Sequence, residues 1–219
     1  MVKLHTVEQL DDAIDAEIAW RKQELSTALR LIRQTSGPSQ KANLRAGVVI
    51  LYAHWEGWVK AVSQLYIRYV NTRAFRYDQL STAFLGTALK TKMGRVEEAT
   101  TPLIHNSFAF FIQNELSAKA KLSEELVRTE SNLSSSVFLA IIDRLGLERR
   151  AKYTLRAQLI DHDLVQQRNT IAHGEYLDLT ASDFGALRTD VLDLLELFTD
   201  EVRNAASTGR HLATPTQED

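Results

Sequence analysis

The spacing of its apolar residues restricts this chain to a helical fold. Along three long segments, apolar side chains recur at steps of three, four and seven residues, which places them on one side of an α-helix. The segments carry Val7, Leu10, Ile14, Ile18, Leu25, Leu29 and Ile32; then Leu44, Val48, Leu51, Trp55, Val59, Val62 and Tyr66; then Phe184, Leu187, Val191, Leu194, Phe198 and Val202. The pattern predicts an all-α fold in which long helices pack their apolar stripes together.

Capping and helix-breaking residues indicate where these helices begin and end. Thr6 followed by Gln9 is typical of an N-terminal cap, and the Ser-Gly-Pro-Ser run at 36–39 ends the first helix. A second long helix is expected from about residue 40 to residue 70. The final helix is expected to begin at Ser182.

The segment from residue 71 to residue 150 has a less regular pattern. Shorter helices are expected at about 78–90, 103–128 and 134–146, with polar breaks between them. We interpret the segment as a helical insertion that forms a lid, a dimer contact or a substrate-selecting wall.

Length and composition limit the class of protein. With 219 residues, of which 44% are hydrophobic, the chain can bury a core as one domain, which we assign to residues 1–206. The polar residues 207–219 are expected to be disordered. A net charge of −2 argues against broad binding to duplexes, so any nucleic-acid site must be a local patch. The absence of cysteine, of a signal peptide and of a long apolar run predicts a cytoplasmic protein without membrane contact.

A short run toward the C-terminus combines groups that suit phosphodiester chemistry. It reads Arg168-Asn169-Thr170-Ile171-Ala172-His173 and is followed by Gly174. Arg168 can hold two phosphate oxygens, and the His173 imidazole can accept a proton and return it. On a helix, Asn169 and His173 share a face, so the amide can orient the ring. Gly174 is a typical helix-ending residue and places His173 in the last turn.

Neighbouring residues allow other interpretations. Arg156 and His162 fit the same relaxed spacing of an arginine and a histidine, so the spacing alone is a weak pattern. Asp161-His162-Asp163 offers metal-ligand types, but consecutive helical residues point about 100° apart and no partner motif of metal-binding spacing is present. A capped helix start, with an interruption of the helix near these residues, is the preferred interpretation, and no metal is predicted.

Two segments resemble the HEPN superfamily, a group of all-helical domains that includes many metal-independent endoribonucleases. Arg168-Asn169-x3-His173-Gly174 resembles the family's Arg-x4-6-His motif. The run Trp55-Glu56-Gly57-Trp58-Val59-Lys60 resembles the Glu-x3-Lys motif that many members carry upstream on a helix. With His54 in front, this run looks most like the bacterial branch called RiboL-PSP-HEPN or MAE-like HEPN. The resemblance covers roughly residues 40–70 and 150–205.

The resemblance implies both a fold and a reaction. The fold would be an up-and-down helical bundle with additional inserted helices. The reaction would be cleavage of RNA without metal or cofactor, in which the 2′-hydroxyl attacks phosphorus and leaves 2′,3′-cyclic phosphate and 5′-hydroxyl ends. His173 would transfer protons, Arg168 would neutralise charge on the phosphoryl oxygens, and Asn169 would orient the ring. Because each chain supplies one such imidazole, a homodimer with its active site at the two-fold interface is expected.

The upstream motif adds accessory candidates. Glu56 and Lys60 are neighbours on one side of a helix and would line or brace the cleft; a plain surface ion pair is the alternative. Trp58 is either an RNA-stacking residue or a core residue. Trp55 lies on the apolar stripe and is expected in the core.

The resemblance also implies a biological setting and an alternative function. Bacterial proteins of this kind often act as toxins of toxin–antitoxin pairs or in phage defence, controlled by an antitoxin or another neighbouring-gene product. Some members cut nothing, so the alternative is a non-catalytic dimeric HEPN module that binds RNA or acts as an adaptor. In one branch a modified tyrosine stands two positions after the histidine, whereas here Tyr176 stands three positions after His173. A structural helical bundle without a nucleic-acid role is the third interpretation.

Overall fold

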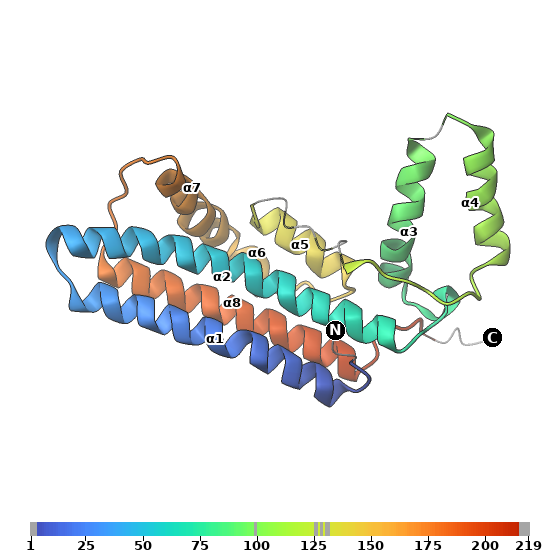
Figure 1. Cartoon of the computed structure of the whole chain (residues 1–219), viewed down its shortest axis with the longest axis horizontal. Helices are drawn as coiled ribbons and strands as arrows, with labels where there is room; N and C mark the ends of the chain where they lie inside the picture. Colours follow the sequence, from blue (N-terminus) through green and yellow to red (C-terminus); the bar gives the residue numbers. More distant parts are fainter. Residues whose placement is uncertain (1–3, 99, 125–126, 128, 130–131, 215–219) are drawn as a thin grey trace.

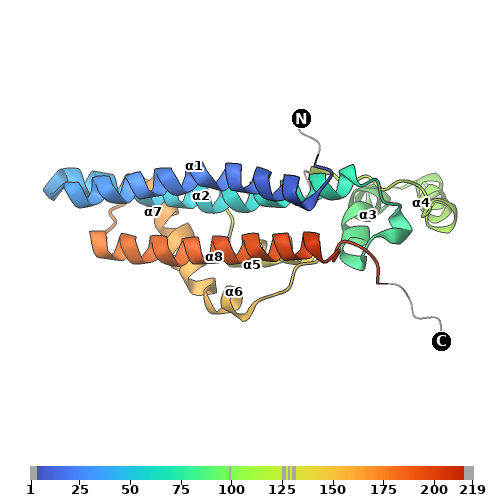
Figure 2. The same ribbon diagram turned by 90° about the horizontal axis from the view of Figure 1, so that it is seen from below.

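Long helices form the body of the molecule. The computed structural model describes residues 4–98, 100–124, 127, 129 and 132–214. The long helices are α1 (Val7–Gln34), α2 (Gly37–Thr72) and α8 (Ala181–Ser207), which lie side by side in Figures 1 and 2. A shorter helical run packs against α2 and consists of the π-helix η3 (Leu159–Gln166) and α7 (Gln167–Ala172). Chain direction alternates through α1, α2, η3–α7 and α8, so the bundle is up-and-down (Figure 1).

Local sequence explains where the long helices begin. The Thr6 hydroxyl accepts a hydrogen bond from the Gln9 N–H at 3.2 Å, which confirms the predicted cap of α1. α2 begins at Gly37, sooner than expected, because the proline that follows is tolerated in the first turn of a helix. Thr180 and Asp183 form a reciprocal capping pair, and α8 therefore begins one residue before the expected start.

The apolar stripes meet in a core between the helices. Nearly all of the stripe residues are buried, and Val7, Ile18 and Leu29 are half-buried at the margin of the core. Complete burial of a large aromatic side chain stabilises a fold by about 2 to 3 kcal/mol. The predicted all-α fold is confirmed, because β structure in the described residues is limited to two isolated bridges. Within the same ranges, no helix combines the length and the apolar content needed to cross a bilayer.

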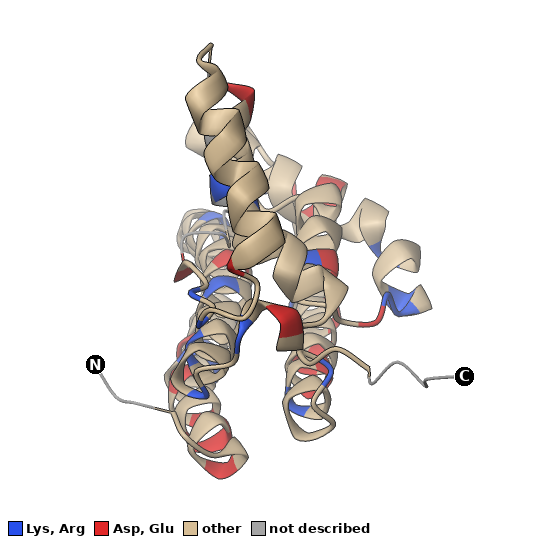
Figure 3. Cartoon of the chain, turned by 90° about the vertical axis from the view of Figure 1, so that its right-hand side faces the viewer, with Lys and Arg blue, Asp and Glu red and all other residues tan. Residues whose placement is uncertain are grey.

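The segment between α2 and η3 divides into a projecting hairpin and a part that packs on the bundle. Its helical elements are η1 (Tyr77–Gln79), α3 (Thr82–Glu97), α4 (Pro102–Asn114), α5 (Ser135–Arg144) and α6 (Ala151–Leu155). α3 and α4 stand away from the bundle at the end opposite α7 (Figure 1). Figure 3 views that end, where α4 carries no charged side chain. α5 joins the core through Phe138, whose ring centroid lies 5.0 Å from that of Trp55.

The helix expected at 103–128 is wrong for residues 115–124, because α4 ends at Asn114; residues 125, 126 and 128 lie outside the described residues. The chain then returns along the end of α2, and the Ala120 N–H donates to the Phe75 carbonyl at 2.8 Å. Leu122 is buried there. Backbone pairing and burial against α2 therefore outweigh the local helical tendency of these residues.

The expected disorder of residues 207–219 is wrong for residues 207–214, which pack onto the bundle. The His211 side chain is 3% exposed. The backbone carbonyl of His211 accepts a hydrogen bond from the Ser81 N–H at 2.9 Å. Aromatic rings from α2 and α3 surround the His211 imidazole. Residues 215–219 lie outside the described residues.

Candidate functional site

The candidate motif lies mainly on α7, which continues directly from η3. The sequence predicted an interrupted helix near residues 161–163, and the structure has π-helical turns there. Ile160, Leu164 and Val165 are buried and hold η3 on the bundle. A π-helical turn changes the direction in which later side chains emerge from a helix, and such turns are frequent at functional sites.

The end of α7 exposes His173. α7 ends at Ala172, and Gly174 adopts a left-handed backbone conformation with φ +77°. The Gly174 N–H donates to the Ile171 carbonyl at 3.1 Å, and the next N–H donates to the Thr170 carbonyl at 3.0 Å. These two bonds form a Schellman motif, which requires a residue that tolerates positive φ after the helix. His173 is the exposed C-terminal cap residue of this turn.

Arg45 on α2 holds this turn from outside the motif. One guanidinium nitrogen donates to the Glu175 carbonyl at 2.6 Å, and another lies 3.4 Å from the Ile171 carbonyl. The two carbonyls lie on either side of His173, one in the last turn of α7 and one just beyond the end of the helix, so Arg45 ties both parts of the turn to α2. No sequence signal singled out Arg45, because it lies 130 residues before Glu175 in the chain.

Arg168 and Asn169 are brought together, but in an arrangement that differs from the expected one. Arg168 Nη1 donates to Asn169 Oδ1 at 2.8 Å, and both residues are half-buried. The amide oxygen therefore contacts the guanidinium, whereas we expected it to orient His173. Asn169 and His173 meet through the backbone, where the His173 N–H donates to the Asn169 carbonyl at 2.9 Å. In the described part of the chain, the His173 ring forms no hydrogen bond.

Tyr52 on α2 lies beneath Arg168 and was missed by sequence reasoning. The Arg168 Cζ atom lies 4.0 Å from the centroid of the Tyr52 ring. The Tyr52 hydroxyl accepts a hydrogen bond from the Leu133 N–H at 2.9 Å. Burial raises the pKa of the Tyr52 hydroxyl, and the negative charge of Glu56 adds to the rise, while hydrogen bonds from Leu133 and Arg168 oppose it.

Glu56 and Lys60 separate into different environments. Glu56 is half-buried, and the Thr129 hydroxyl donates a hydrogen bond to its carboxylate. Lys60 is exposed, and no ion pair joins it to Glu56 among the described side chains. Glu56 thus braces the loop before α5 and lies near Tyr52, whereas Lys60 faces solvent.

Trp55 and Trp58 both belong to the core. Each side chain is 0% exposed. The Trp55 indole N–H donates to the Leu133 carbonyl, and the Trp58 indole N–H donates to the Thr199 hydroxyl, both at 2.9 Å. Of the two interpretations of Trp58, RNA stacking is wrong and the core residue is correct: the ring is fully buried, with Lys22 of α1 and Thr199 of α8 beside it, and no face is left on which a base can stack.

His54 and Gly57, just before and in the upstream motif, lie at the contact between α1 and α2. The buried His54 ring lies 2.6 Å from Glu24 and 3.4 Å from Arg21, and burial lowers its pKa although Glu24 opposes the change. A Cβ atom on Gly57 would stand 2.7 Å from a guanidinium nitrogen of Arg21. A side chain at position 57 would therefore displace the Arg21 guanidinium, which lies against α2.

The competing pair and the Asp-His-Asp run have structural explanations. Arg156 forms an ion pair with Asp190 on α8, and His162 is exposed on η3. Asp161 accepts hydrogen bonds from the backbone N–H and the hydroxyl of Ser135, at 2.7 and 2.6 Å, and so caps the start of α5. Across the described residues, no group of three or more metal-ligand side chains gathers in one place.

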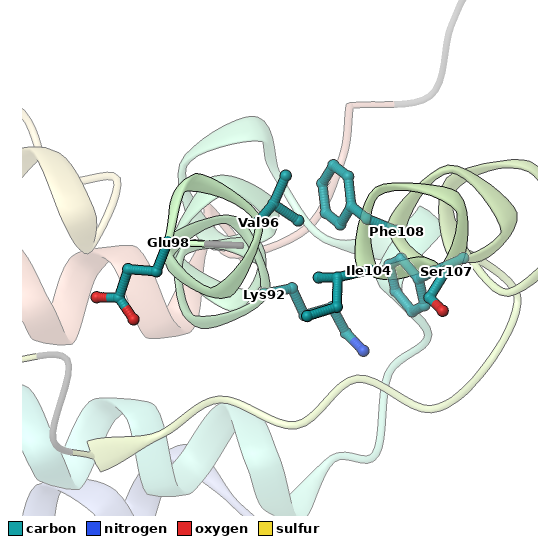
Figure 4. A pocket seen from close by; sticks show the side chains of 7 residues that line it. Lys92, Val96, Glu98, Ile104, Ser107 and Phe108 are labelled. Atoms are coloured by element: carbon teal, nitrogen blue, oxygen red, sulfur yellow. The ribbon is translucent and has the colours of Figure 1, made fainter. Parts of the chain in front are cut away.

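The α3–α4 hairpin has a pocket of its own, remote from α7. Val96 on α3 and Ile104 and Phe108 on α4 line an apolar cavity of about 510 Å³ between the two helices (Figure 4). Because the hairpin stands at the opposite end of the bundle, it does not cover the motif of its own chain (Figure 1).

A family model described as MAE_28990-like HEPN matches residues 10–210 of the chain. The match extends over both motif segments and the residues between them. Neither a curated protein nor a solved structure matches the chain.

Proposed function

Since the chain belongs to the MAE_28990-like HEPN family, we propose that it is a metal-independent endoribonuclease of the HEPN type. The arrangement of α7 carries the proposal. A half-buried Arg168 is held by Asn169 and by the ring of Tyr52, and an exposed His173 stands at the end of the same helix. A fixed cation and an accessible imidazole are the groups that in-line cleavage of RNA requires.

The reaction uses the chemistry of RNA itself. The 2′-hydroxyl loses its proton and attacks the adjacent phosphorus, the bond to the 5′-oxygen breaks, and a proton is returned to that oxygen. The products are a 2′,3′-cyclic phosphate and a 5′-hydroxyl. His173 transfers protons, and Arg168 stabilises negative charge on the non-bridging oxygens. Lys60, which is exposed, contacts the phosphate backbone of the bound RNA, and Glu56 braces the loop before α5 through its hydrogen bond with Thr129.

A homodimer completes the site. One proton must be removed and another supplied, and each chain offers one exposed imidazole at the end of α7. A two-fold axis beside the end of α7 places the second copy of His173 opposite the first, so that one acts as base and the other as acid. The exposure of His173 at the end of α7 supports a dimer of this kind, because its imidazole lies at the surface, where a second chain can approach it.

The test is cleavage of a mixed-sequence single-stranded RNA in the presence of EDTA, followed by analysis of the fragment ends. The wild type is compared with Arg168→Ala, His173→Ala and the matched control His162→Ala, which removes an exposed histidine from the neighbouring η3. Loss of His173 should slow cleavage about 10²- to 10⁴-fold, the usual contribution of a general acid–base group.

Two outcomes separate the possibilities. Cyclic-phosphate ends made by the wild type and by His162→Ala, but not by the two motif variants, would support the proposed nuclease. RNA left intact by the wild type at high concentration, or equal cleavage by His173→Ala, would refute it.

The proposed setting is a toxin or phage-defence effector acting on RNA, held in check by an antitoxin or another neighbouring-gene product. Induced expression of the wild type should stop the growth of a bacterial host, and His173→Ala should not. A co-expressed neighbouring gene product that restores growth would be the antitoxin. Growth arrest that persists in His173→Ala would rule out cleavage as its cause.

One observation favours a second candidate function. Because Asn169 contacts Arg168, nothing in the described chain orients the His173 ring. This fits a non-catalytic dimeric module that binds RNA phosphates or acts as an adaptor. Unchanged RNA affinity in His173→Ala, together with the absence of cleavage by the wild type, would identify this function.

A further inference from the structure

We propose that Tyr52 is a positioning residue that holds the Arg168 guanidinium in the orientation needed for cleavage; this rests on the proposed ribonuclease function. Tyr52 lies outside both HEPN-like motifs. Its contact with Arg168 links α2 to α7 across 116 residues of sequence.

The geometry is that of a platform under a cation. The Arg168 Cζ atom lies 4.0 Å from the centroid of the Tyr52 ring, well within the range of a cation–π contact. A planar guanidinium stacks on an aromatic face while its edge remains able to donate hydrogen bonds. Asn169 takes one of these bonds at 2.8 Å. Arg168 is thus held on one face by an aromatic ring and at its edge by an amide.

The platform is itself rigid. The Tyr52 side chain is 4% exposed and stands on α2, the central helix of the bundle. Its hydroxyl accepts the Leu133 N–H at 2.9 Å, which sets the direction of the ring axis. Because the Tyr52 side chain is fixed at its backbone and at its hydroxyl, it restricts the motion of the Arg168 guanidinium. A positive charge held in place in this way stabilises the negative charge that develops on the phosphoryl oxygens during cleavage.

Glu56 contributes to the position of Arg168 through its interaction with Tyr52. It follows Tyr52 by four residues on α2, so the two side chains share one side of the helix. The carboxylate accepts a hydrogen bond from Thr129 and lies close enough to interact with the Tyr52 hydroxyl. Tyr52 therefore contacts Arg168 of one HEPN-like motif and interacts with Glu56 of the other.

The kinetic test separates the ring from the hydroxyl. Tyr52→Phe keeps the aromatic face, and Tyr52→Leu removes it. Tyr69→Leu is the matched control, because Tyr69 is a similarly buried tyrosine, 3% exposed, farther along α2. We expect Tyr52→Leu to lower kcat on a short RNA by about tenfold with KM changed less than about twofold, and Tyr52→Phe, which keeps the ring but loses the contacts of the hydroxyl with Leu133 and Arg168, to lower kcat less than Tyr52→Leu does.

A spectroscopic measurement reports on the same contact without activity. A proton held over an aromatic face resonates upfield, so the Arg168 Nε–H signal of the ¹⁵N-labelled protein should be shifted upfield and assignable by its loss in Arg168→Lys. The shift should persist in Tyr52→Phe and disappear in Tyr52→Leu. Tyr69→Leu should leave it unchanged.

The outcomes distinguish this inference from the function on which it rests. Cleavage by the wild type together with full activity in Tyr52→Leu would overturn the role of Tyr52 and leave the ribonuclease standing. Equal losses in Tyr52→Leu and Tyr69→Leu would reduce Tyr52 to a stabilising residue and also overturn the proposal. If the wild type cuts no RNA, the nuclease fails, and the Arg168 signal then decides whether Tyr52 holds the guanidinium.

Discussion

Protonation of His211 should destabilise the folded protein in mildly acidic solution. The imidazole is 3% exposed and lies among aromatic rings, with its centroid 5.4 Å from that of Phe75 and 5.8 Å from that of Tyr69. Burial lowers the pKa of His211 from 6.5 to about 4, and the positive charge of Arg73 adds to the decrease, while the Ala205 carbonyl opposes it.

The sign and the size of the effect follow from this pKa. The unfolded chain takes up a proton near pH 6.5 and the folded protein only near pH 4, so the neutral imidazole stabilises the fold fully above the first value. The contribution of the neutral imidazole to stability is lost as the pH falls from about 6.5 toward about 4. At about 1.4 kcal/mol per pKa unit, the total loss is about 3 kcal/mol, of which about 2 kcal/mol falls between about pH 7 and about pH 5.

The assay is urea denaturation of the wild type and of His211→Gln at several pH values. Glutamine is polar but does not titrate, so the wild type should lose about 2 kcal/mol more than the variant between about pH 7 and about pH 5. Every other titrating group is common to both proteins. At about pH 8 both side chains are neutral, so the difference there measures packing alone.

Equal pH dependence in the two proteins would refute the reasoning, since it would mean that His211 charges as easily in the folded state as in the unfolded state. An NMR titration of the His211 ring in the wild type gives an independent measurement. A midpoint near pH 6.5 in the folded protein would contradict burial as the cause of the shift.

Arg45→Gln should lower the free energy of unfolding by about 1 kcal/mol, because it removes the side chain that holds the carbonyls at the end of α7; urea denaturation measures this, and an unchanged midpoint would contradict it. Gly174→Ala and Gly37→Ala each place a side chain at positive φ, with no atom within 4 Å, and should each cost about 1 to 2 kcal/mol of stability. RNA cleavage should fall in the Gly174 variant only, and parallel losses of activity would count against a site at the end of α7. Trp58→Phe should lower stability by about 1 to 3 kcal/mol, since it leaves the buried Thr199 hydroxyl without its donor, while RNA affinity measured by fluorescence polarisation should stay unchanged.

Features that depend on neighbouring residues could be predicted from the sequence. The apolar stripes located the three long helices, and Thr6 located the start of α1, because both depend on side chains within a few positions of each other. Gly174 placed His173 at the end of a helix for the same reason. Two short motifs were also sufficient to identify the family.

Features that depend on packing against distant elements could not be predicted. One stripe on α2 was visible in the sequence, but α1, α8 and the η3–α7 run all contact α2, so Trp58 and Tyr52 are buried on other sides of the helix. The same limit explains why the helix expected beyond Asn114 is wrong and why the order of His211 was not expected. The Ala120 N–H and the His211 ring find their partners in elements that are remote in the sequence.

The sequence by itself determined that this is a helical HEPN protein with an arginine on a short helix and a histidine at the end of the same helix. Only the tertiary structure decided which neighbours those two side chains have. Arg168 meets Tyr52, and the turn that carries His173 is held by Arg45, both from α2. The physical reason is that these contacts join residues more than a hundred positions apart, and no helical period relates residues at such a separation.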